Sequence, residues 1–502
     1  MDKLLEKREL RDLQILSLLY SEERWWSTEE IAQHLNTSID SANKSVNILI
    51  ALANNFEGDF QIVNQKNKGV ILHVASNYTI AKIESIYYQN TTSYQIINEL
   101  FQNPDLTLDK LINDLFISKS TLYRKLKSID FILEKNNLSL DKNTFKIIGS
   151  EMNIREFYYT FYWAIRPDTW PFRMVKRDVF EHRLDTLIRE TELELSSVEK
   201  MQMYYRMAIN FIQQQKKQFI TEDVANVVVD PYRLFFLKDI GQSLVANVPA
   251  PYQQQEFYYL ALIFSTYPYM GADPEAESLL PIVNWYREQQ TLSYRISEHW
   301  INSLAQHYPN QKIKDTLTDP KFMFMLLSVT NYSLLFPKLF IHSELTASWR
   351  NQAAVFKKAT PGFYQHVKTI AQSIEEMPEF KESLMSTSYS IYAIYSIFQQ
   401  FFDLYAFENT LTIKVVSAAD AISEVTLSET LKNRMSQNLI ISLSNDREDQ
   451  NQVYDLLLSD VAFPENQGPK SKETYIWDFP PSNRDWQNIT DLLDRMIIEK
   501  KQ

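Results

Sequence analysis

The sequence predicts a multidomain, mainly α-helical protein with two N-terminal helix–turn–helix units, two all-helical domains and a small C-terminal α/β domain. Three observations lead to this prediction. A pattern of short helices followed by a hairpin occurs twice within the first 150 residues. Apolar and aromatic residues then recur at helical spacing up to about residue 405. Beyond that point, short apolar strands alternate with helical segments, which is typical of a parallel sheet.

The composition is that of a globular protein with several domains. At about 100–200 residues per domain, 502 residues correspond to roughly three to five domains. The chain has no cysteine, which excludes disulfides and thiolate chemistry, and its 7 glycines form no nucleotide-binding motif. The charged N-terminal residues are unlike a signal peptide, and the longest apolar runs fall far short of the roughly 20 residues of a membrane helix. We therefore expect a cytoplasmic protein without membrane contact.

Residues 1–75 are predicted to form the first helix–turn–helix. Leucines recur at helical spacing near the N-terminus, and Ser27 and Glu30 have the spacing of a capping box, which opens a second helix. A third helix follows a short polar turn. The segment 60–74 reads as two strands joined at Asn67, Lys68 and Gly69.

Residues 76–155 are predicted to repeat this arrangement. Helices are expected at 94–102 and 107–116, and Ser118 is a suitable N-cap for a third helix. A hairpin is expected at 138–150. The alternative, an accidental run of short helices, would have to occur twice, so we interpret both segments as winged helix–turn–helix domains.

Charge is distributed unevenly along the chain. The formal net charge is −12, yet residues 110–150 hold eight basic and four acidic side chains. Residues 1–60 hold six basic and eleven acidic ones. Because attraction to phosphate depends on the local field, an acidic protein can bind DNA through one basic face.

The third helix of the second unit is predicted to be the principal DNA reader. On a helical wheel Leu122, Leu126 and Ile129 face the core, whereas Arg124 and Lys127 lie on the opposite side, which enters the major groove in a winged helix–turn–helix. The alternative is an ordinary solvated face. The residues expected to contact DNA are Ser118, Lys119, Ser120, Thr121, Tyr123, Arg124, Lys127 and Lys142, with a secondary contact from Ser41, Lys44 and Asn47 of the first unit.

The remainder is predicted to comprise helical domains at 156–288 and 289–408 and an α/β domain at 409–502. Aromatic stripes, such as the one from Phe157 to Tyr162, are interpreted as core. The seven histidines have no metal-ligand spacing, and no nucleophile is paired with a base. We expect no metal, no cofactor and no enzymatic activity.

The order of these segments resembles the Mga family of Gram-positive global transcription regulators, which includes virulence regulators. The stretches 115-LFISKSTLYRKLKSIDFIL-133 and 147-IIGSEMNIREFYY-159 carry the resemblance. It implies that the helical domains are regulation domains of the type phosphorylated on histidine by the sugar phosphotransferase system. It also implies an enzyme-IIB-like tail, a dimer or larger oligomer, and a preference for A/T-rich, intrinsically bent DNA.

Two features depart from the pattern of that family. The first helical domain has a single histidine, His182, with Lys176, Arg177 and Arg183 nearby in sequence, so paired phosphoacceptors are absent there. The candidate phosphorylation sites are His182, His299 and His342. The place of the enzyme-IIB cysteine reads 416-VSAAD-420, so the tail is expected to serve dimerisation or partner binding and not phosphate transfer.

These observations favour a dimeric regulator that binds double-stranded promoter DNA and is modulated by the phosphocarrier protein of the phosphotransferase system. The alternative is a protein-interaction hub of that system with vestigial DNA-binding units. The acidic first helix–turn–helix and the enzyme-IIB-like tail motivate this alternative.

Overall fold

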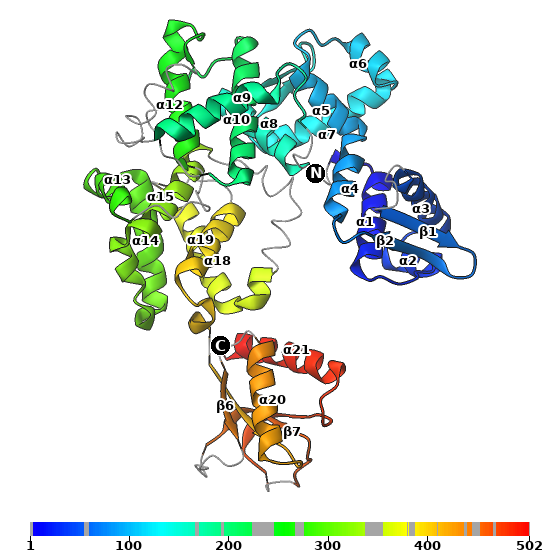
Figure 1. Cartoon of the computed structure of the whole chain (residues 1–502), viewed down its shortest axis with the longest axis vertical. Helices are drawn as coiled ribbons and strands as arrows, with labels where there is room; N and C mark the ends of the chain where they lie inside the picture. The colour runs from blue at the N-terminus through cyan, green and yellow to red at the C-terminus, as the bar shows by residue number, and fades with distance from the viewer. Residues whose placement is uncertain are drawn as a thin grey trace. The chain divides into compact units, whose positions relative to one another are not determined.

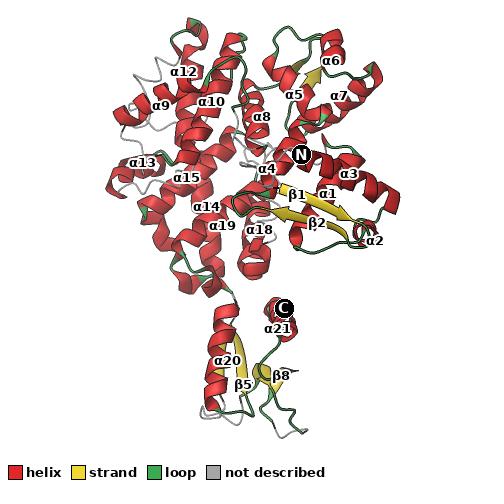
Figure 2. Cartoon of the chain, turned by 45° about the vertical axis from the view of Figure 1, so that its right-hand side comes forward, coloured by secondary structure: helices red, strands yellow, loops and turns green. Residues whose placement is uncertain are grey.

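The chain folds into a mainly helical, multidomain structure with small hairpins near its N-terminus and one parallel sheet near its C-terminus (Figures 1 and 2). A computed structural model describes residues 4–54, 60–165, 170–191, 195–222, 245–266, 276–336, 355–378, 380, 387–408, 410–435, 439–443, 452–464 and 468–500. Met1–Asp273 with Leu334–Ala347 forms one compact unit, and Pro274–Ser333 with Ser348–Gln502 forms the other. The predicted mainly helical, multidomain class is confirmed.

The first helix–turn–helix has the predicted order of elements. Its elements are α1 (Lys7–Ser21), α2 (Thr28–His34), α3 (Ile39–Ala53), β1 (Phe60–Gln65) and β2 (Gly69–Val74). Ser27 caps α2, and the predicted capping box with Glu30 is present. Trp26 pairs with Val70 through two backbone hydrogen bonds of 2.8 Å, which adds a short bridge to the hairpin. Gly69 has a φ of +97°, and a Cβ there would meet the Trp26 carbonyl oxygen at 2.2 Å, so only glycine fits.

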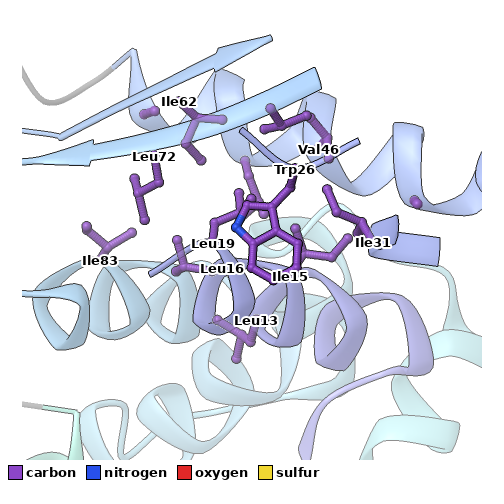
Figure 3. Packing of buried hydrophobic residues seen from close by; sticks show 14 of the residues in the cluster. Leu13, Ile15, Leu16, Leu19, Trp26, Ile31, Val46, Ile62, Leu72 and Ile83 are labelled. Carbon is purple, nitrogen blue, oxygen red and sulfur yellow. The ribbon is translucent and has the colours of Figure 1, made fainter. Parts of the chain in front are cut away.

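The core of the first helix–turn–helix lies between its three helices and the hairpin (Figure 3). Figure 3 shows Trp26 at the centre, surrounded by side chains from both sides. Leu16 and Ile31 come from the first two helices, Val46 from the third and Leu72 from the hairpin. All of them are buried, which explains why leucines and isoleucines recur at helical spacing there.

The second helix–turn–helix repeats this arrangement with a shorter hairpin. Its elements are α5 (Thr92–Gln102), α6 (Leu108–Asp114), α7 (Lys119–Glu134), β3 (Ser139–Asp141) and β4 (Lys146–Ile148). We call the antiparallel pair β3–β4 the wing. A helix that the sequence analysis did not foresee, α4 (Ile80–Gln89), precedes α5. Its residues Ile83 and Tyr87 pack against the core of the first helix–turn–helix, so its apolar face is covered by residues distant in sequence.

The helices that follow the wing bury several charged side chains. They are α8 (Glu151–Ala164), α9 (Arg177–Thr191), α10 (Ser197–Gln215) and α12 (Ala250–Thr266). The aromatic stripe of α8 is buried, as predicted. Arg155 Nη2 lies 2.7 Å from Glu256 Oε1, and Arg206 Nη1 lies 2.6 Å from Glu156 Oε2. Pairing offsets the cost of burying these charges and ties α8 to α10 and α12.

The second compact unit begins with a further set of helices. They are α13 (Ala276–Glu288), α14 (Leu292–His307), η3 (Pro309–Gln311), η4 (Ile313–Thr318), α15 (Pro320–Leu335), α18 (Pro361–Glu376), α19 (Thr387–Phe401) and η5 (Leu404–Phe407). Glu408 accepts hydrogen bonds from the backbone N–H groups of Gly362 and Phe363 at the start of α18. This carboxylate satisfies donors that the first turn of a helix leaves free. None of the described helices in either unit is long and apolar enough to cross a membrane.

The chain ends in the α/β domain that the sequence predicted. Its elements are β5 (Leu411–Val416), α20 (Ala421–Arg434), β6 (Leu439–Leu443), β7 (Tyr454–Ser459), β8 (Ser471–Ile476) and α21 (Asn483–Glu499). All strand pairs are parallel, in the order β6-β5-β7-β8. Helix α20 begins after Asp420, which caps it by accepting from the Ser423 N–H at 2.7 Å. Strand β7 ends at Ser459, whose hydroxyl accepts from the Val461 N–H.

A buried carboxylate, Asp455, joins three parts of this α/β domain. It lies 2.8 Å from Lys472 and 2.6 Å from Lys500, and it accepts from the Thr412 N–H at 2.9 Å. Burial by itself raises the pKa of Asp455, but the hydrogen bonds from the two lysines and Thr412 outweigh it and hold the pKa well below its usual range. The charged carboxylate therefore connects strands β5 and β7 with the segment after α21.

Replacing Asp455 with Asn is expected to destabilise this domain by about 1–3 kcal/mol at neutral pH, because two lysines lose their anion. The folded-state pKa lies below that of the unfolded chain, so the contribution is complete above about pH 4 and is lost as the pH falls further. Hydrogen exchange of β5 and β7 peptides in the full chain measures the effect. The difference between the two proteins should shrink in acid.

Asp478→Asn is the matched control, since Asp478 is exposed and lies in the same domain. Equal exchange rates for Asp455→Asn and Asp478→Asn at neutral pH would show that the Asp455 contacts contribute nothing.

Candidate functional site

Helix α7 presents the face that the helical wheel predicted. Leu122, Leu126 and Ile129 are fully buried, and the exposed side carries Arg124 and Lys127. The Ser118 hydroxyl accepts from the Thr121 N–H at 3.1 Å and so defines the start of the helix. The other predicted contact residues in this helix, Lys119, Ser120 and Tyr123, are exposed, and Thr121 is half-buried.

Three hydroxyl groups gather at the N-terminal end of α7. The Ser118 Oγ lies 2.9 Å from both the Ser120 Oγ and the Thr121 Oγ1. Hydroxyls beside free backbone N–H groups are suited to phosphate oxygens, because both can donate and the helix dipole favours an anion there. The first turn of α7 is therefore a place where a DNA backbone could be held.

Just before this turn, Phe116 has a left-handed backbone and a side chain that is 95% exposed. Asn36, at the matching position of the first helix–turn–helix, also has a positive φ of 48°. The sharp turn between the two helices thus demands this conformation in both copies, although phenylalanine tolerates it less well than asparagine. Phe116 was not predicted from the sequence as a site residue.

The cations of α7 are not all available to a ligand. Arg124 Nη2 lies 3.0 Å from Glu6 Oε1, at the start of α1. Lys125 Nζ lies 3.2 Å from the same oxygen and 3.7 Å from Glu9 Oε2, and its side chain is only 5% exposed. Lys119 and Lys127 have no side-chain partner among the described residues. The surface charge of this region is therefore smaller than the sequence count suggested.

The region of α1 contacts α4 and the second helix–turn–helix through polar groups. Tyr87 donates to Asp12 at 2.7 Å, and the Ser93 hydroxyl donates to the Leu4 carbonyl oxygen at 2.7 Å. Burial raises the pKa of Glu6, but the hydrogen bond and charge of Lys125 and the charge of Arg124 outweigh it, so the pKa lies below its usual value. The only sequence signal of this contact is the spacing of carboxylates at 6, 9 and 12 on one side of α1.

In the wing, Lys142 is engaged by Asp130 of α7. Their charged atoms are 2.9 Å apart, and Asp130 also accepts from the Leu140 N–H at 2.9 Å. Lys142 therefore holds the wing to α7, and its charge is partly neutralised. Lys146, by contrast, is exposed and has no side-chain partner among the described residues.

The first helix–turn–helix presents a weaker face, in line with its sequence. Lys44 is paired with Asp40 at 2.7 Å, and the Ser41 hydroxyl accepts from Ser38. Asn47 is exposed without a partner among the described residues. At the position that matches Lys125, this unit has Ser45, which is buried. No exposed, unpaired cation remains on the described face of α3.

The candidate histidines are placed very differently. His182 is exposed on α9, and its neighbour Arg177 is paired with Glu181 at 2.6 Å. His342 lies outside the described residues. His299 Nε2 lies 3.2 Å from the Ser303 hydroxyl on the next turn of α14.

His299 belongs to a cluster that the sequence did not identify. His307 Nδ1 donates to the Ser303 carbonyl oxygen at 2.9 Å, and the ring of His307 lies 4.3 Å from that of His366 on α18. The Tyr308 hydroxyl oxygen lies 2.6 Å from His366 Nδ1. The pairing of residues from α14 and α18 depends on how these helices pack, so residue spacing contained no signal for it. Among the described residues, no group of acidic and histidine side chains could hold a metal ion.

In the loop after β5, carboxylates of the chain itself accept hydrogen bonds from the hydroxyl and backbone donors. Asp460 accepts from the Ser417 hydroxyl and from the Ala418 N–H, both at 2.7 Å. Glu424 accepts from the Ser417 N–H at 3.0 Å. These donors, at the carboxyl end of a parallel strand, are thus already occupied.

Comparison with known proteins identifies a domain family and several relatives. Residues 76–162, which contain α4 to α7, the wing and most of α8, match the Mga helix-turn-helix domain. The chain is 26% identical over 336 residues to the capsule synthesis positive regulator AcpB of Bacillus anthracis, which is 64% of this chain and 66% of that protein. It is 24% identical over 308 residues to the capsule synthesis positive regulator AcpA of the same organism, or 60% of this chain and 62% of that protein.

A third relative is the anthrax toxin expression trans-acting positive regulator of Bacillus anthracis, 21% identical over 205 residues, or 41% of this chain and 42% of that protein. The chain thus spans less than two thirds of the length of each of these relatives. The match to the domain family includes the whole of α7 and its hydroxyl cluster. The chain therefore contains an Mga helix-turn-helix domain and is a distant homologue of the Mga-family positive regulators.

Proposed function

We propose that this protein is a DNA-binding transcription regulator of the Mga type, with α7 as its principal DNA-reading helix. The observation that carries the proposal is the exposed face of α7, where a hydroxyl cluster at the helix start adjoins the unpaired cations Lys119 and Lys127. The names of the relatives support a positive regulator. Contact with chromosomal DNA places the protein in the cytoplasm.

The side chains of α7 favour recognition of DNA shape over a strict sequence code. Arg124 is the single side chain on this face that can fork onto a guanine, and it is engaged by Glu6. The serines, threonine and lysines of the face are suited to phosphate, which positions a protein without reading bases. This is consistent with the preference for A/T-rich or bent promoter DNA that the resemblance to the Mga family implies, because DNA deformability is then the main source of discrimination.

Glu6 competes with DNA for Arg124 in this proposal. The pair is partly exposed, so its net strength is small, about 0.2–1 kcal/mol. A DNA phosphate or a guanine edge can therefore replace Glu6 at little cost. The first helix–turn–helix is proposed to make a secondary contact, since Lys44 is balanced by Asp40.

We further propose that the protein acts as a dimer and that the α/β domain contributes to the contact. Two apolar side chains on α20, Ile422 and Val425, are 77% and 48% exposed. They are three residues apart, so they lie on the same face of the helix. The loop after β5 is filled by Asp460 and Glu424, which supports an interaction role for this enzyme-IIB-like domain in place of phosphate transfer.

Histidine phosphorylation by the phosphotransferase system is proposed to modulate activity through the cluster on α14 and α18. His307 is exposed at the rim of the cluster, and His366 and Tyr308 lie beside it. A phosphoryl group there adds close to two negative charges between the helices and changes their packing. His182 is the alternative acceptor in the first helical domain, although Glu181 engages the nearby Arg177.

Substituting Arg124 and Lys127 together by Ala is expected to weaken binding to A/T-rich duplex DNA at least about tenfold. A plot of log affinity against log salt concentration has a negative slope. This slope should become shallower by about 0.9 for each DNA phosphate that the variant no longer neutralises. Fluorescence anisotropy at several salt concentrations measures both.

The matched control is Lys44→Ala with Asn47→Ala at the equivalent positions of α3, for which a smaller loss is expected. If the α3 variant loses as much affinity as the α7 variant, α7 is not the principal reader. If the α7 variant binds like the parent protein, the proposal for α7 is wrong.

Glu6→Gln keeps an amide oxygen beside the buried Lys125, which also retains Glu9. In the folded variant DNA affinity is expected to rise about two- to fivefold, because Arg124 no longer has to leave a carboxylate. The gain should disappear when Arg124 is also Ala. Asp478→Asn, which removes the same charge from the C-terminal domain, is the control and should leave affinity unchanged. A gain that persists without Arg124 would show that Glu6 acts through general repulsion.

Phosphate transfer from the phosphocarrier protein of the system, with phosphoenolpyruvate and its enzyme I, tests the histidine proposal. Mass spectrometry is expected to place the phosphoryl group on a peptide of α14 or α18, and His307→Ala with His366→Ala should remove it. His182→Ala should leave the signal intact. A label at His182, or no label, would contradict the assignment to this cluster.

A further inference from the structure

A pocket of about 170 Å³ lies where the wing meets the helices that follow it, within the first compact unit. Residues 144–147 of the wing form one wall, and the segment 103–106 after α5 forms another. Helix α8 contributes Ile154 and Tyr158, and the end of α10 contributes Gln213. The pocket therefore touches both the DNA-binding domain and the helical region behind it.

Two lysines that line this pocket lack a carboxylate partner. Lys146 has no side-chain contact among the described residues, and Lys216 forms no ion pair with a described carboxylate. The ammonium of Lys216 donates instead to the Phe101 carbonyl oxygen and lies 4.7 Å from the centroid of the Phe101 ring. A half-buried cation with only a neutral acceptor has lost hydration without gaining an anion.

The buried charges near this pocket are paired, which makes the half-buried Lys216 unusual. Glu151 is the one carboxylate among the pocket-lining residues, and its Oε1 already accepts from Arg155 at 2.9 Å and from Gln213 at 3.0 Å. Arg155 in turn is paired with Glu256. Burial and the charge of Lys146 lower the pKa of Lys216 to about 8, against the opposing effect of Glu151. Positive charge at this pocket is therefore poorly compensated.

The rest of the lining is mixed: Asn103, Thr144, Gln213 and Gln218 are polar, and one part of the wall is apolar. Leu100, Leu106, Ile154 and Tyr158 face a space whose volume is close to the roughly 150 Å³ that suffices for benzene in an apolar cavity. A ligand that matches both parts has one anionic end and a small hydrocarbon body.

We propose that this pocket binds a small organic carboxylate, with its anionic end at Lys146 and Lys216 and its apolar body against Leu106 and Ile154. Because Lys146 belongs to β4, a bound ligand changes the position of the wing and thereby the affinity for DNA. This regulatory consequence rests on the proposed function, whereas the binding itself does not.

Benzoate is the probe, and benzamide, which has the same ring without the charge, is its neutral counterpart. Isothermal titration of the full-length chain without DNA should show benzoate binding at least about tenfold tighter than benzamide. Binding should weaken as the pH rises through about 8, since Lys216 then loses its charge.

Lys216→Met should reduce benzoate affinity about tenfold, and Lys146→Met should weaken it in the same direction. Lys217→Met is the matched control, because Lys217 is exposed, adjacent in sequence and not part of the pocket lining. Circular dichroism checks that each variant is folded. If Lys216→Met does not fold, the loss of benzoate affinity in Lys146→Met tests the proposal.

No benzoate binding, or equal losses for the Lys216 and Lys217 variants, would overturn the proposal. A Lys216→Met variant that loses DNA affinity but keeps benzoate binding would assign the lysine to a DNA phosphate instead. If the Arg124 and Lys127 variants leave DNA affinity unchanged, only the proposal for α7 is contradicted. The benzoate proposal is unaffected, because the titration with benzoate contains no DNA.

Discussion

The charge of Lys125 lies inside the first compact unit and can remain there only because carboxylates of α1 face it. Its ammonium lies 3.2 Å from Glu6 and 3.7 Å from Glu9, and the side chain is almost fully buried. Without these partners the desolvated ammonium would cost several kcal/mol. The start of α1 is consequently part of the environment of α7, and the two helix–turn–helix units are coupled by charge as well as by the packing of α4.

This coupling also shapes the face that is proposed to meet DNA. Glu6 reaches both the buried Lys125 and the exposed Arg124, so one carboxylate serves an interior and a surface contact. The first copy has no such arrangement, because buried Ser45 there accepts from Arg11 at 2.9 Å. The same backbone motif therefore carries different electrostatics in its two copies. Lys119 and Lys127 remain the unpaired cations among the described residues of α7.

Much of the local structure could be predicted because it depends on neighbours in sequence. The cap at Ser118, the capping box at Ser27 and the buried side of α7 follow from hydrogen bonds and helical periodicity within a few residues. The parallel strands at the C-terminus followed from their alternation with helices. Helix α4 was missed because the residues that cover its apolar face lie far away along the chain.

By itself, the sequence determined the duplicated helix–turn–helix and the C-terminal α/β domain. It also showed that α7 is richer in cations than α3. Each of these depends on periodicity, caps and local composition. The tertiary structure decided which charges remain free. It buried Lys125, paired Arg124 with Glu6 and Lys142 with Asp130, and brought His307 beside His366. The physical reason is that electrostatic interactions act over a few ångströms in space, and folding brings together residues whose separation in sequence gives no indication of that proximity.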